Sequence, residues 1–364
     1  MTTTNNNEHK KLNVPNIRFP EFSGEWEYFL INDVCSEFKS GKNIKADSIS
    51  ESGEYPVYGG NGLRGYASSY NHDGLYVLIG RQGALCGNVR SVYGKTYITE
   101  HAIAVAGNEI SNTSFLHQLF LKMNLGQYSD QSAQPGLAVN KLLKLKVALP
   151  SVLEQTKIAS LLSLLDERIS TQTKIIDKLQ TLIKGLRNDV FGKLRKSVGF
   201  NAMISDVLSY EQPQSYIVED TEYTNEGTPV LTANKAFVLG YTSEIDGIYD
   251  KGDCILFDDF TLDCKYVDFP FKVKSSAIKI LTAENKELLR YTFEFLKYLD
   301  LSTDEHKRHY ITETQNLGFI LPTKQIVRTI SHVFSALSLQ METIVKQKNA
   351  LEKQKQYLLR QMFI

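Results

Sequence analysis

The chain has 364 residues, which is longer than one typical domain and predicts two or three domains. Its hydrophobic share of 42% and charged share of 23% exclude a disordered chain and a collagen-like fibre. The 41 basic side chains equal the 41 acidic ones, a balance that disfavours a protein that coats nucleic acid through bulk charge.

The zero net charge is a sum of unequal parts. Residues 201–320 contain 21 acidic and 11 basic side chains, whereas residues 321–364 contain 7 basic and 2 acidic ones. Residues 151–200 are also basic, with 9 basic and 5 acidic side chains. Any contact with DNA is therefore expected to rely on a few placed side chains rather than on bulk charge.

The first ten residues are polar and lack the apolar stretch of a signal peptide. The four cysteines show no close spacing, which fits a reducing compartment and predicts neither a zinc ribbon nor a redox dithiol. No run of eighteen apolar residues occurs, so no membrane span is expected. We therefore expect a cytoplasmic protein with a disordered tail over residues 1–14.

Residues 15–150 and 196–320 are each predicted to form a mixed α/β unit, in which glycine turns separate short strands. The apolar runs predict strands at Tyr76–Ile79, Tyr97–Ile98, Ala102–Val105, Leu145–Leu149, Cys254–Phe257 and Ala277–Leu281, and short helices at Phe115–Met123 and Lys286–Leu299.

Residues 151–195 are predicted to form a long helix. Their apolar residues recur at alternating steps of four and three, which is the pattern of a coiled-coil seam, and Gln172 is its polar exception. Pro150 precedes the helix, and Ser151 with Glu154 has the spacing of a capping box. The seam includes Leu162, Leu165, Ile169, Ile176, Leu179, Ile183 and Leu186.

A second copy of this helix is predicted over residues 321–364. The segment Leu149–Phe191 aligns without gaps to Leu321–Phe363 at an offset of 172, and both copies begin with Leu-Pro. Lys348 and Lys355 occupy seam positions, which is awkward in a closed two-stranded coil and leaves solvent or a third partner as their environment. The apolar seam of this copy includes Phe334, Leu337, Met341, Leu351 and Leu358.

The repeat predicts an α+β fold with two mixed α/β units in pseudo-twofold repeat. Each helix must bury its stripe, and the twin helix is the obvious partner, so we expect an antiparallel coiled coil that separates the units by about 50 Å. The alternative is that both helices pack as ordinary core elements of one globule. The predicted boundaries are 1–14 for the tail, 15–150 and 196–320 for the units, and 151–195 and 321–364 for the spacer helices.

Two glycine motifs resemble nucleotide sites but lack their context. Gly94-Lys95-Thr96 ends like a phosphate-binding P-loop, although Val89 stands where that loop needs a glycine. The segment Gly60–Gly65 spells G-x-G-x-x-G, yet we expect neither a strand before it nor a helix after it. Both nucleotide sites are therefore rejected.

Asp253, Asp263 and Lys265 have the spacing of a metal-dependent nuclease. In such a site the carboxylates hold Mg²⁺, and the lysine stabilises charge on the scissile phosphate. The motif is short and has no counterpart in the first half, so nuclease chemistry is kept only as an alternative.

DNA binding is better supported, because basic and amide side chains are interleaved with tyrosines and glycine turns. Arginine suits guanine, and asparagine or glutamine suits adenine. The competing interpretation is that these are solvated turn residues. The candidates are Lys42, Asn61, Arg64, Arg81, Gln82, Asn88, Arg90 and Lys95 in the first unit, and Asn234, Lys235, Lys265, Lys272, Lys274, Lys307, Arg308 and His309 in the second. Asp258 and Asp259 either accept from cytosine amino groups or only repel phosphate.

The sequence resembles the specificity subunits of type I restriction–modification systems over nearly its whole length. The resemblance includes Pro15–Phe22 with Gly24-Glu-Trp-Glu27, the turn Tyr58–Tyr66, the stretch Leu256–Thr261 with Asp268–Ala277, and the two Leu-Pro-headed helices. It implies a non-catalytic chain in which each globular unit is a target-recognition domain reading one half of a split, asymmetric double-stranded DNA sequence.

The resemblance also implies partners. The paired helices would fix the gap between the half-sites and dock two methyltransferase subunits, which restriction/translocase subunits then join. This chain would hold no cofactor, since S-adenosylmethionine, ATP and Mg²⁺ belong to the partner subunits. The seam residues given above are the candidate partner-binding positions. Two rival functions remain open, the Mg²⁺-dependent nuclease and a coiled-coil scaffold without DNA contact.

Overall fold

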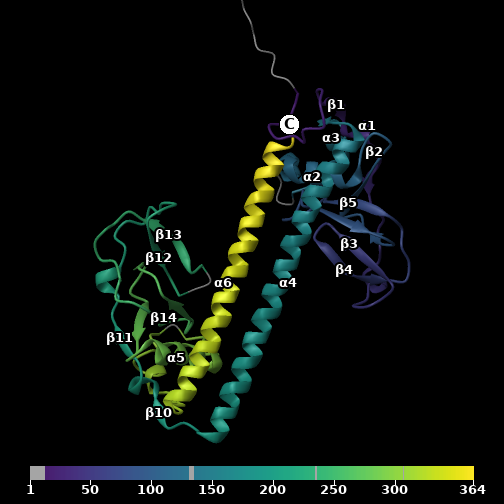
Figure 1. Ribbon diagram of the computed structural model, residues 1–364. Helices are drawn as coiled ribbons and strands as arrows, with labels where there is room; N and C mark the ends of the chain where they lie inside the picture. The colour runs from purple at the N-terminus through teal and green to yellow at the C-terminus, as the bar shows by residue number, and fades with distance from the viewer. Residues whose placement is uncertain (1–12, 131–134, 234–235, 306) are drawn as a thin grey trace, which may run out of the picture. The chain divides into compact units, whose positions relative to one another are not determined.

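A computed structural model describes residues 13–130, 135–233, 236–305 and 307–364 (Figure 1). The chain divides into two compact units: unit 1 consists of Met1–Gln172 and Gln347–Ile364, and unit 2 consists of Thr173–Lys346. The long helices α4 (Val152–Ser197) and α6 (Lys324–Gln361) each contribute one stretch to either unit. Each unit therefore combines an α/β part with a pair of helix segments.

Unit 1 builds its α/β part from three small sheets. A four-stranded sheet has the order β2-β8-β5-β6, a three-stranded sheet has the order β4-β3-β7, and β1 pairs with β9. The strands are β1 (Glu27–Leu30), β2 (Cys35–Ser40), β3 (Tyr55–Gly59), β4 (Gly62–Ala67), β5 (Leu75–Gly80), β6 (Val89–Tyr93), β7 (Tyr97–Ile98), β8 (Ala102–Gly107) and β9 (Lys146–Leu149); the shorter helices are α1 (Ile31–Val34), α2 (Thr113–Met123) and α3 (Val139–Leu142).

The two faces of the four-stranded sheet in unit 1 bury different layers. Alternate residues of a strand point to opposite faces, so Val77 and Ile79 of β5 join the core that includes Phe115 of α2. Leu78 points the other way and packs with Ile98 of the three-stranded sheet. The unit is therefore layered as helix, four-stranded sheet and three-stranded sheet.

Unit 2 repeats this topology strand by strand. Its four-stranded sheet has the order β11-β17-β14-β15, its three-stranded sheet has the order β13-β12-β16, and β10 pairs with β18. The elements are β10 (Ala202–Met203), β11 (Ser209–Glu211), β12 (Thr228–Leu231), β13 (Val238–Thr242), β14 (Cys254–Asp258), β15 (Cys264–Val267), β16 (Lys272–Val273), β17 (Ile278–Thr282), β18 (Gly318–Phe319) and α5 (Lys286–Leu299).

The repeat extends to details of register and capping. The β3–β7 pair and the β12–β16 pair are the parallel ones of each three-stranded sheet, with Val57 opposite Tyr97 and Val230 opposite Lys272. Asn112 caps α2 by accepting from the Phe115 N–H, as Asn285 caps α5. The structure thus confirms the predicted fold class of two mixed α/β parts in repeat with two long helices.

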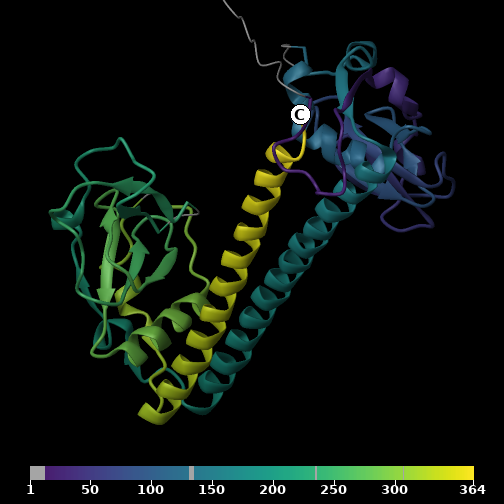
Figure 2. The same ribbon diagram turned by 45° about the horizontal axis from the view of Figure 1, so that its top comes forward.

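In each unit the long helices lie side by side and run antiparallel (Figures 1 and 2). In unit 1, Leu162 of α4 shares a core with Leu351 and Leu359 of α6. In unit 2, Leu186 of α4 shares a core with Phe334 of α6. These contacts confirm that the twin helices bury their stripes against each other.

Twin phenylalanines anchor the helix ends in the two units. Phe363, just beyond α6, stacks on Phe115 at 5.1 Å between ring centroids and meets Trp26 at 6.3 Å. Phe191, its twin at the offset of 172, stacks on Tyr298 at 5.4 Å in unit 2. The sequence repeat therefore marks equivalent packing positions.

The start of α4 differs in one detail from the predicted capping box. The Ser151 hydroxyl accepts from the Glu154 N–H at 3.3 Å, as expected. The Glu154 carboxylate turns instead to Arg18, which donates to it from Nε at 2.8 Å and from Nη2 at 2.7 Å. A bidentate charge-assisted pair is stronger than a hydrogen bond to the cap backbone, which explains the difference.

All eight strands and helices predicted from apolar runs are present. One expectation about the glycine turn was wrong, because β3 leads directly into the segment Gly60–Gly65. The segment continues into β4 rather than into a helix, so the rejection of a dinucleotide site stands. Over the described ranges, no helix is long and apolar enough to cross a membrane.

Candidate nucleic-acid interface

Unit 1 gathers polar side chains where the β3–β4 turn meets the β5–β6 loop. A Cβ at Gly60 would lie 2.6 Å from the His101 carbonyl oxygen and 3.3 Å from the Gly80 Cα. At Gly62, φ is +113° and a Cβ would overlap the Arg90 guanidinium. Glycine is needed at Gly60 because its backbone lies against neighbouring backbone atoms, and at Gly62 because residues with a side chain rarely adopt this φ. We call residues 59–64, 81–90 and His101 the loop edge of unit 1.

Polar contacts tie this loop edge together. Arg90 donates from Nη2 to the Asn61 carbonyl oxygen at 3.4 Å, and Gln82 Oε1 lies 3.1 Å from His101 Nδ1. The Arg81 N–H donates to the His101 carbonyl oxygen at 3.0 Å. Amide and guanidinium groups on loops and at strand ends, such as these, can read base edges.

The loop edge of unit 1 brings together most of the predicted residues of this half. Lys42 lies beside it, since its N–H donates to the Ile98 carbonyl oxygen at 3.0 Å. Lys95 is separate, beyond the opposite end of β6, with its Nζ 5.0 Å from the centroid of the Tyr70 ring. His101 was missed, although its place just before a predicted strand marks it as a loop residue. The residues brought together are Asn61, Arg64, Arg81, Gln82, Asn88 and Arg90.

Unit 2 has an equivalent loop edge, formed by residues 258–265, 274–277 and 305–309, with residue 306 outside the described ranges. The Asp259 N–H donates to the Ala277 carbonyl oxygen at 2.8 Å. The equivalent hydrogen bond in unit 1 runs from the Arg81 N–H to the His101 carbonyl oxygen. Lys265 lies opposite Leu256 in the β14–β15 pair, as Arg90 lies opposite Leu78 in the β5–β6 pair. Register therefore places a basic side chain at the same position of both edges.

The predicted residues of unit 2 have mixed environments. Lys274 and Lys307 are exposed on the loop edge. Lys272 is buried, with its Nζ 2.5 Å from a Glu244 carboxylate oxygen, so it faces the interior. His309 is also buried, with its Nδ1 2.8 Å from a Glu313 oxygen. The remaining candidates are Lys265 and Arg308, which are on the loop edge, and Asn234 and Lys235, which lie outside the described residues.

The carboxylates of Asp258 and Asp259 are used inside the fold. Asp258 Oδ1 accepts from the N–H groups of Phe260 and Thr261, both at 2.9 Å. Asp259 accepts from the Tyr310 N–H at 2.8 Å, and its other oxygen lies 3.3 Å from the buried Lys279 ammonium. The idea that this pair accepts from cytosine amino groups is therefore wrong.

The nuclease alternative also fails on geometry. Asp253 lies just before β14 and Asp263 lies beyond its other end. Burial opposes ionisation of Asp263, but hydrogen bonds and charges from Lys297 and Lys265 outweigh it and lower the pKa of this carboxyl. Asp253 accepts from the Tyr266 hydroxyl at 2.6 Å. Within the described part of the chain, no three His, Cys, Asp or Glu side chains converge as metal ligands.

Part of the acidic excess of unit 2 lies at the far end of its three-stranded sheet. The strand β12 runs toward the β12–β13 turn on the loop-edge side, and β13 runs back, so the segments before β12 and after β13 lie at the other end. At about 3.3 Å per residue, these strands put some 13–16 Å between the two ends. The exposed carboxylates at that end are Glu219, Asp220, Glu222, Glu226, Asp246 and Asp250.

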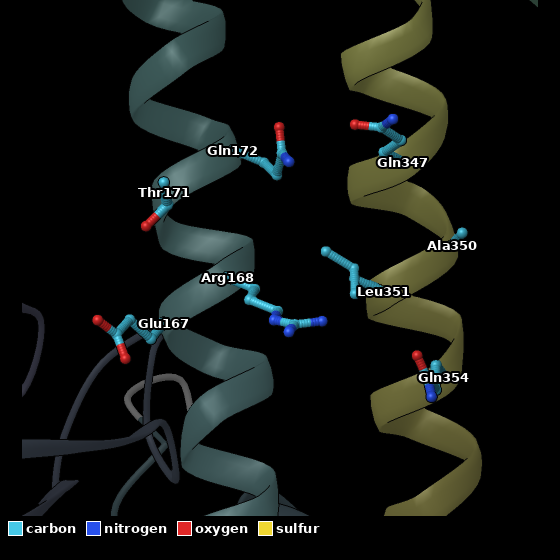
Figure 3. A pocket seen from close by; sticks show the side chains of 8 residues that line it. All are labelled: Glu167, Arg168, Thr171, Gln172, Gln347, Ala350, Leu351 and Gln354. Atoms are coloured by element: carbon cyan, nitrogen blue, oxygen red, sulfur yellow. The ribbon is translucent and has the colours of Figure 1, made fainter.

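The helix pair in unit 1 opens into a polar gap of about 560 Å³ (Figure 3). Arg168 of α4 and Leu351 of α6 point toward each other across it, and Gln172 points toward α6. The buried Gln172 Oε1 has no hydrogen-bond partner among the described residues. The predicted awkward Lys355 is compensated, because its ammonium lies 2.5 Å from an Asp166 oxygen.

The candidate partner-binding residues mostly pack within the chain. Leu162, Leu165, Leu351 and Leu358 belong to or pack against the core of unit 1, and Ile183, Leu186, Phe334 and Leu337 belong to or pack against that of unit 2. Exposed apolar side chains lie on other faces of the same helices, including Leu164 at 58%, Leu182 at 58% and Leu339 at 66% exposure. The remaining candidates Ile169, Ile176 and Met341 are partly buried, and Leu179 is buried.

Comparison with known proteins identifies the class of the first half. Residues 23–181 match the family described as the type I restriction modification DNA specificity domain. The match covers the α/β part of unit 1, including its loop edge, and most of α4. This segment is therefore similar to type I DNA specificity domains.

Named relatives and a solved structure agree with that class. The EcoprrI specificity subunit of Escherichia coli is 44% identical over 163 residues, which are 44% of this chain and 40% of that protein. The EcoR124I/EcoR124II specificity subunit of Escherichia coli is 43% identical over 126 residues, or 33% of this chain and 31% of that protein. The chain thus matches less than half the length of these curated relatives.

The fold is also similar to a crystal structure of a type I restriction–modification S subunit from M. genitalium. The TM-score is 0.75 with 15% identity, and the similarity covers 96% of this chain and 99% of that chain. The predicted resemblance to type I specificity subunits, a non-catalytic class, is confirmed.

Proposed function

We propose that the chain reads a bipartite, asymmetric sequence in double-stranded DNA as the specificity subunit of a type I restriction–modification enzyme. Each unit reads one half-site through its loop edge. The observation that supports this proposal most directly is that both units have this loop edge, with Arg90 and Lys265 at the same register position of equivalent strands. The acidic end of unit 2 would face away from the phosphates, because it lies at the other end of the sheet.

The proposal assigns no catalysis to this chain. Two methyltransferase subunits carry S-adenosylmethionine and modify the DNA, and restriction/translocase subunits bring ATP and Mg²⁺ chemistry. Since the substrate is chromosomal or invading DNA, the assembly works in the cytoplasm. Partner subunits supply much of the phosphate contact, which is consistent with the zero net charge of the chain.

The methyltransferase subunits dock on the long helices in this proposal. Because many seam residues already pack within the chain, we assign docking to the outer faces that carry Leu164, Leu182 and Leu339. Exposed leucines on otherwise polar helices bury apolar area when a partner helix covers them. The polar gap at Arg168 and Gln172 offers hydrogen-bond groups to the same partner.

The experiment is selection from a library of random duplex DNA by the full chain assembled with a methyltransferase subunit from its source. We expect enrichment of two short half-sites at a fixed gap. Arg90→Ala should relax one half-site and Lys265→Ala the other, each by about 1–3 kcal/mol if its residue contacts a base. Enrichment of no sequence would refute the proposed function. Loss of both half-sites in either variant would refute the assignment of one half-site to each unit.

A further inference from the structure

Arg308 on the loop edge of unit 2 is both held and exposed. It donates from Nη1 to the Ser276 carbonyl oxygen at 3.2 Å and from Nη2 to the Ser276 hydroxyl at 3.3 Å. Its guanidinium lies over the Phe260 ring, 5.8 Å from the centroid. The side chain is still 49% exposed. These contacts fix the plane of the guanidinium while one side remains open to a ligand.

Arg308 shares its carboxylate partner with another cation. Among the described residues, the carboxylate oxygen that pairs with Arg308 belongs to Asp259, at 3.9 Å, and the same oxygen lies closer to the Lys279 ammonium, at 3.3 Å. Asp259 is buried and holds the local backbone by accepting from the Tyr310 N–H. The Asp259–Lys279 pair therefore supports the backbone beneath Arg308, and its carboxylate lies closer to Lys279 than to Arg308.

Other basic side chains on this edge are bound differently. Lys265 lies 3.2 Å from a carboxylate oxygen of Asp263. Lys307 lies between two carboxylates, 2.6 Å from Glu305 and 2.8 Å from Glu313. A lysine also lacks the planar fork of an arginine, so its orientation toward a base edge is less fixed.

We infer that Arg308 reads a guanine in the half-site recognised by unit 2. An arginine has five N–H donors, and the two hydrogen bonds to Ser276 leave three for the O6 and N7 acceptors of guanine in the major groove. Because the guanidinium is already oriented, little side-chain entropy is lost on binding. This inference rests on the proposed function and names a specificity-determining residue within it.

The test compares variants of the full chain, assembled with the methyltransferase, in selection from random duplex DNA. Arg308→Ala and Arg308→Lys should each lose preference for one G·C pair by about tenfold to a hundredfold. The half-site read by unit 1 should be unchanged in the same experiment, which shows that the variant is folded. Lys286→Ala is the control, because Lys286 is exposed at the start of α5, away from the loop edge, and this variant should keep the preference. Ser276→Ala removes one hydrogen bond and should weaken the same G·C preference by a smaller factor.

Two results would overturn the inference. One is an unchanged motif in Arg308→Ala. The other is a uniform loss of affinity in Arg308→Ala that Arg308→Lys restores, since that behaviour identifies a phosphate contact. If the unaltered chain selects no motif, the proposed function itself fails. If it selects a motif that Arg308→Ala leaves intact, only the inference fails.

Discussion

Removal of the Phe363 ring should destabilise unit 1 strongly, although the residue is next to the end of the chain. Its side chain is 4% exposed and packs on Phe115 and Trp26. A buried phenylalanine replaced by alanine costs about 3–5 kcal/mol, because apolar contacts are lost and a cavity remains. We expect about 4 kcal/mol for Phe363→Ala.

The single tryptophan gives this prediction a local assay. Trp26 is buried in the same core, 6.3 Å from Phe363, so its fluorescence reports the unfolding of unit 1. With a urea dependence of about 2 kcal/mol per M, the midpoint should fall by about 2 M. Tyr357→Ala is the control, since Tyr357 is 56% exposed on α6 and its removal should shift the midpoint little.

The twin residue provides a second comparison. Phe191→Ala removes the equivalent ring in unit 2 and should shift the Trp26 fluorescence transition less than Phe363→Ala does. The loss of helical circular dichroism in Phe191→Ala should begin at a lower urea concentration than in the unaltered protein. A Trp26 midpoint in Phe363→Ala that matches the unaltered protein would refute the packing argument. So would an equal shift in Tyr357→Ala.

Two further predictions concern pH and spacing. Burial lowers the pKa of His117 to about 4, with Asp166 opposing and Lys355 adding to the shift. In the unfolded chain this histidine takes up its proton near pH 6.5, so the free energy of unfolding of unit 1 should fall by up to about 3 kcal/mol between pH 6.5 and pH 4. Urea midpoints measured at pH 7.5 and 4.5 check this, and His117→Asn should reduce the difference between them. Matched seven-residue insertions after Gln172 and after Lys346 add about 10 Å of helix. They should widen the gap between the two half-sites in the selected DNA by about three base pairs. An unchanged gap would contradict a spacing role for the helices.

The elements that could be predicted from the sequence are those whose apolar residues form a long or continuous pattern. The heptad seams were recognised by their periodicity, the repeat by its self-similarity at an offset of 172, and the strands by their continuous apolar runs. Strand β3 was missed because Tyr55–Gly59 contains proline and glycine and gains its order from pairing with β4 and β7. The two-residue strand β16 (Lys272–Val273) was missed because it is too short to show a pattern of its own, whereas β7, of the same length, was recognised from Tyr97 and Ile98.

The candidate site was predictable as a set of loops but not residue by residue. Lys272 looks like a surface lysine in the sequence, and its burial depends on Glu244, which is 28 residues away. Asp259 looks like a possible base contact, and its carboxylate is used by Lys279 and Tyr310. Long-range ion pairs of this kind are set by tertiary packing, which one sequence does not display.

The central claim is that two equivalent units read two different half-sites for a methyltransferase. Single-molecule sequencing of DNA methylation in cells that carry this chain with its partner subunits tests it most directly. The account predicts adenine methylation at one asymmetric sequence of two parts separated by a gap of fixed length, lost when the chain is deleted. Methylation that is unchanged by the deletion, or that marks a continuous sequence without a gap, would contradict it.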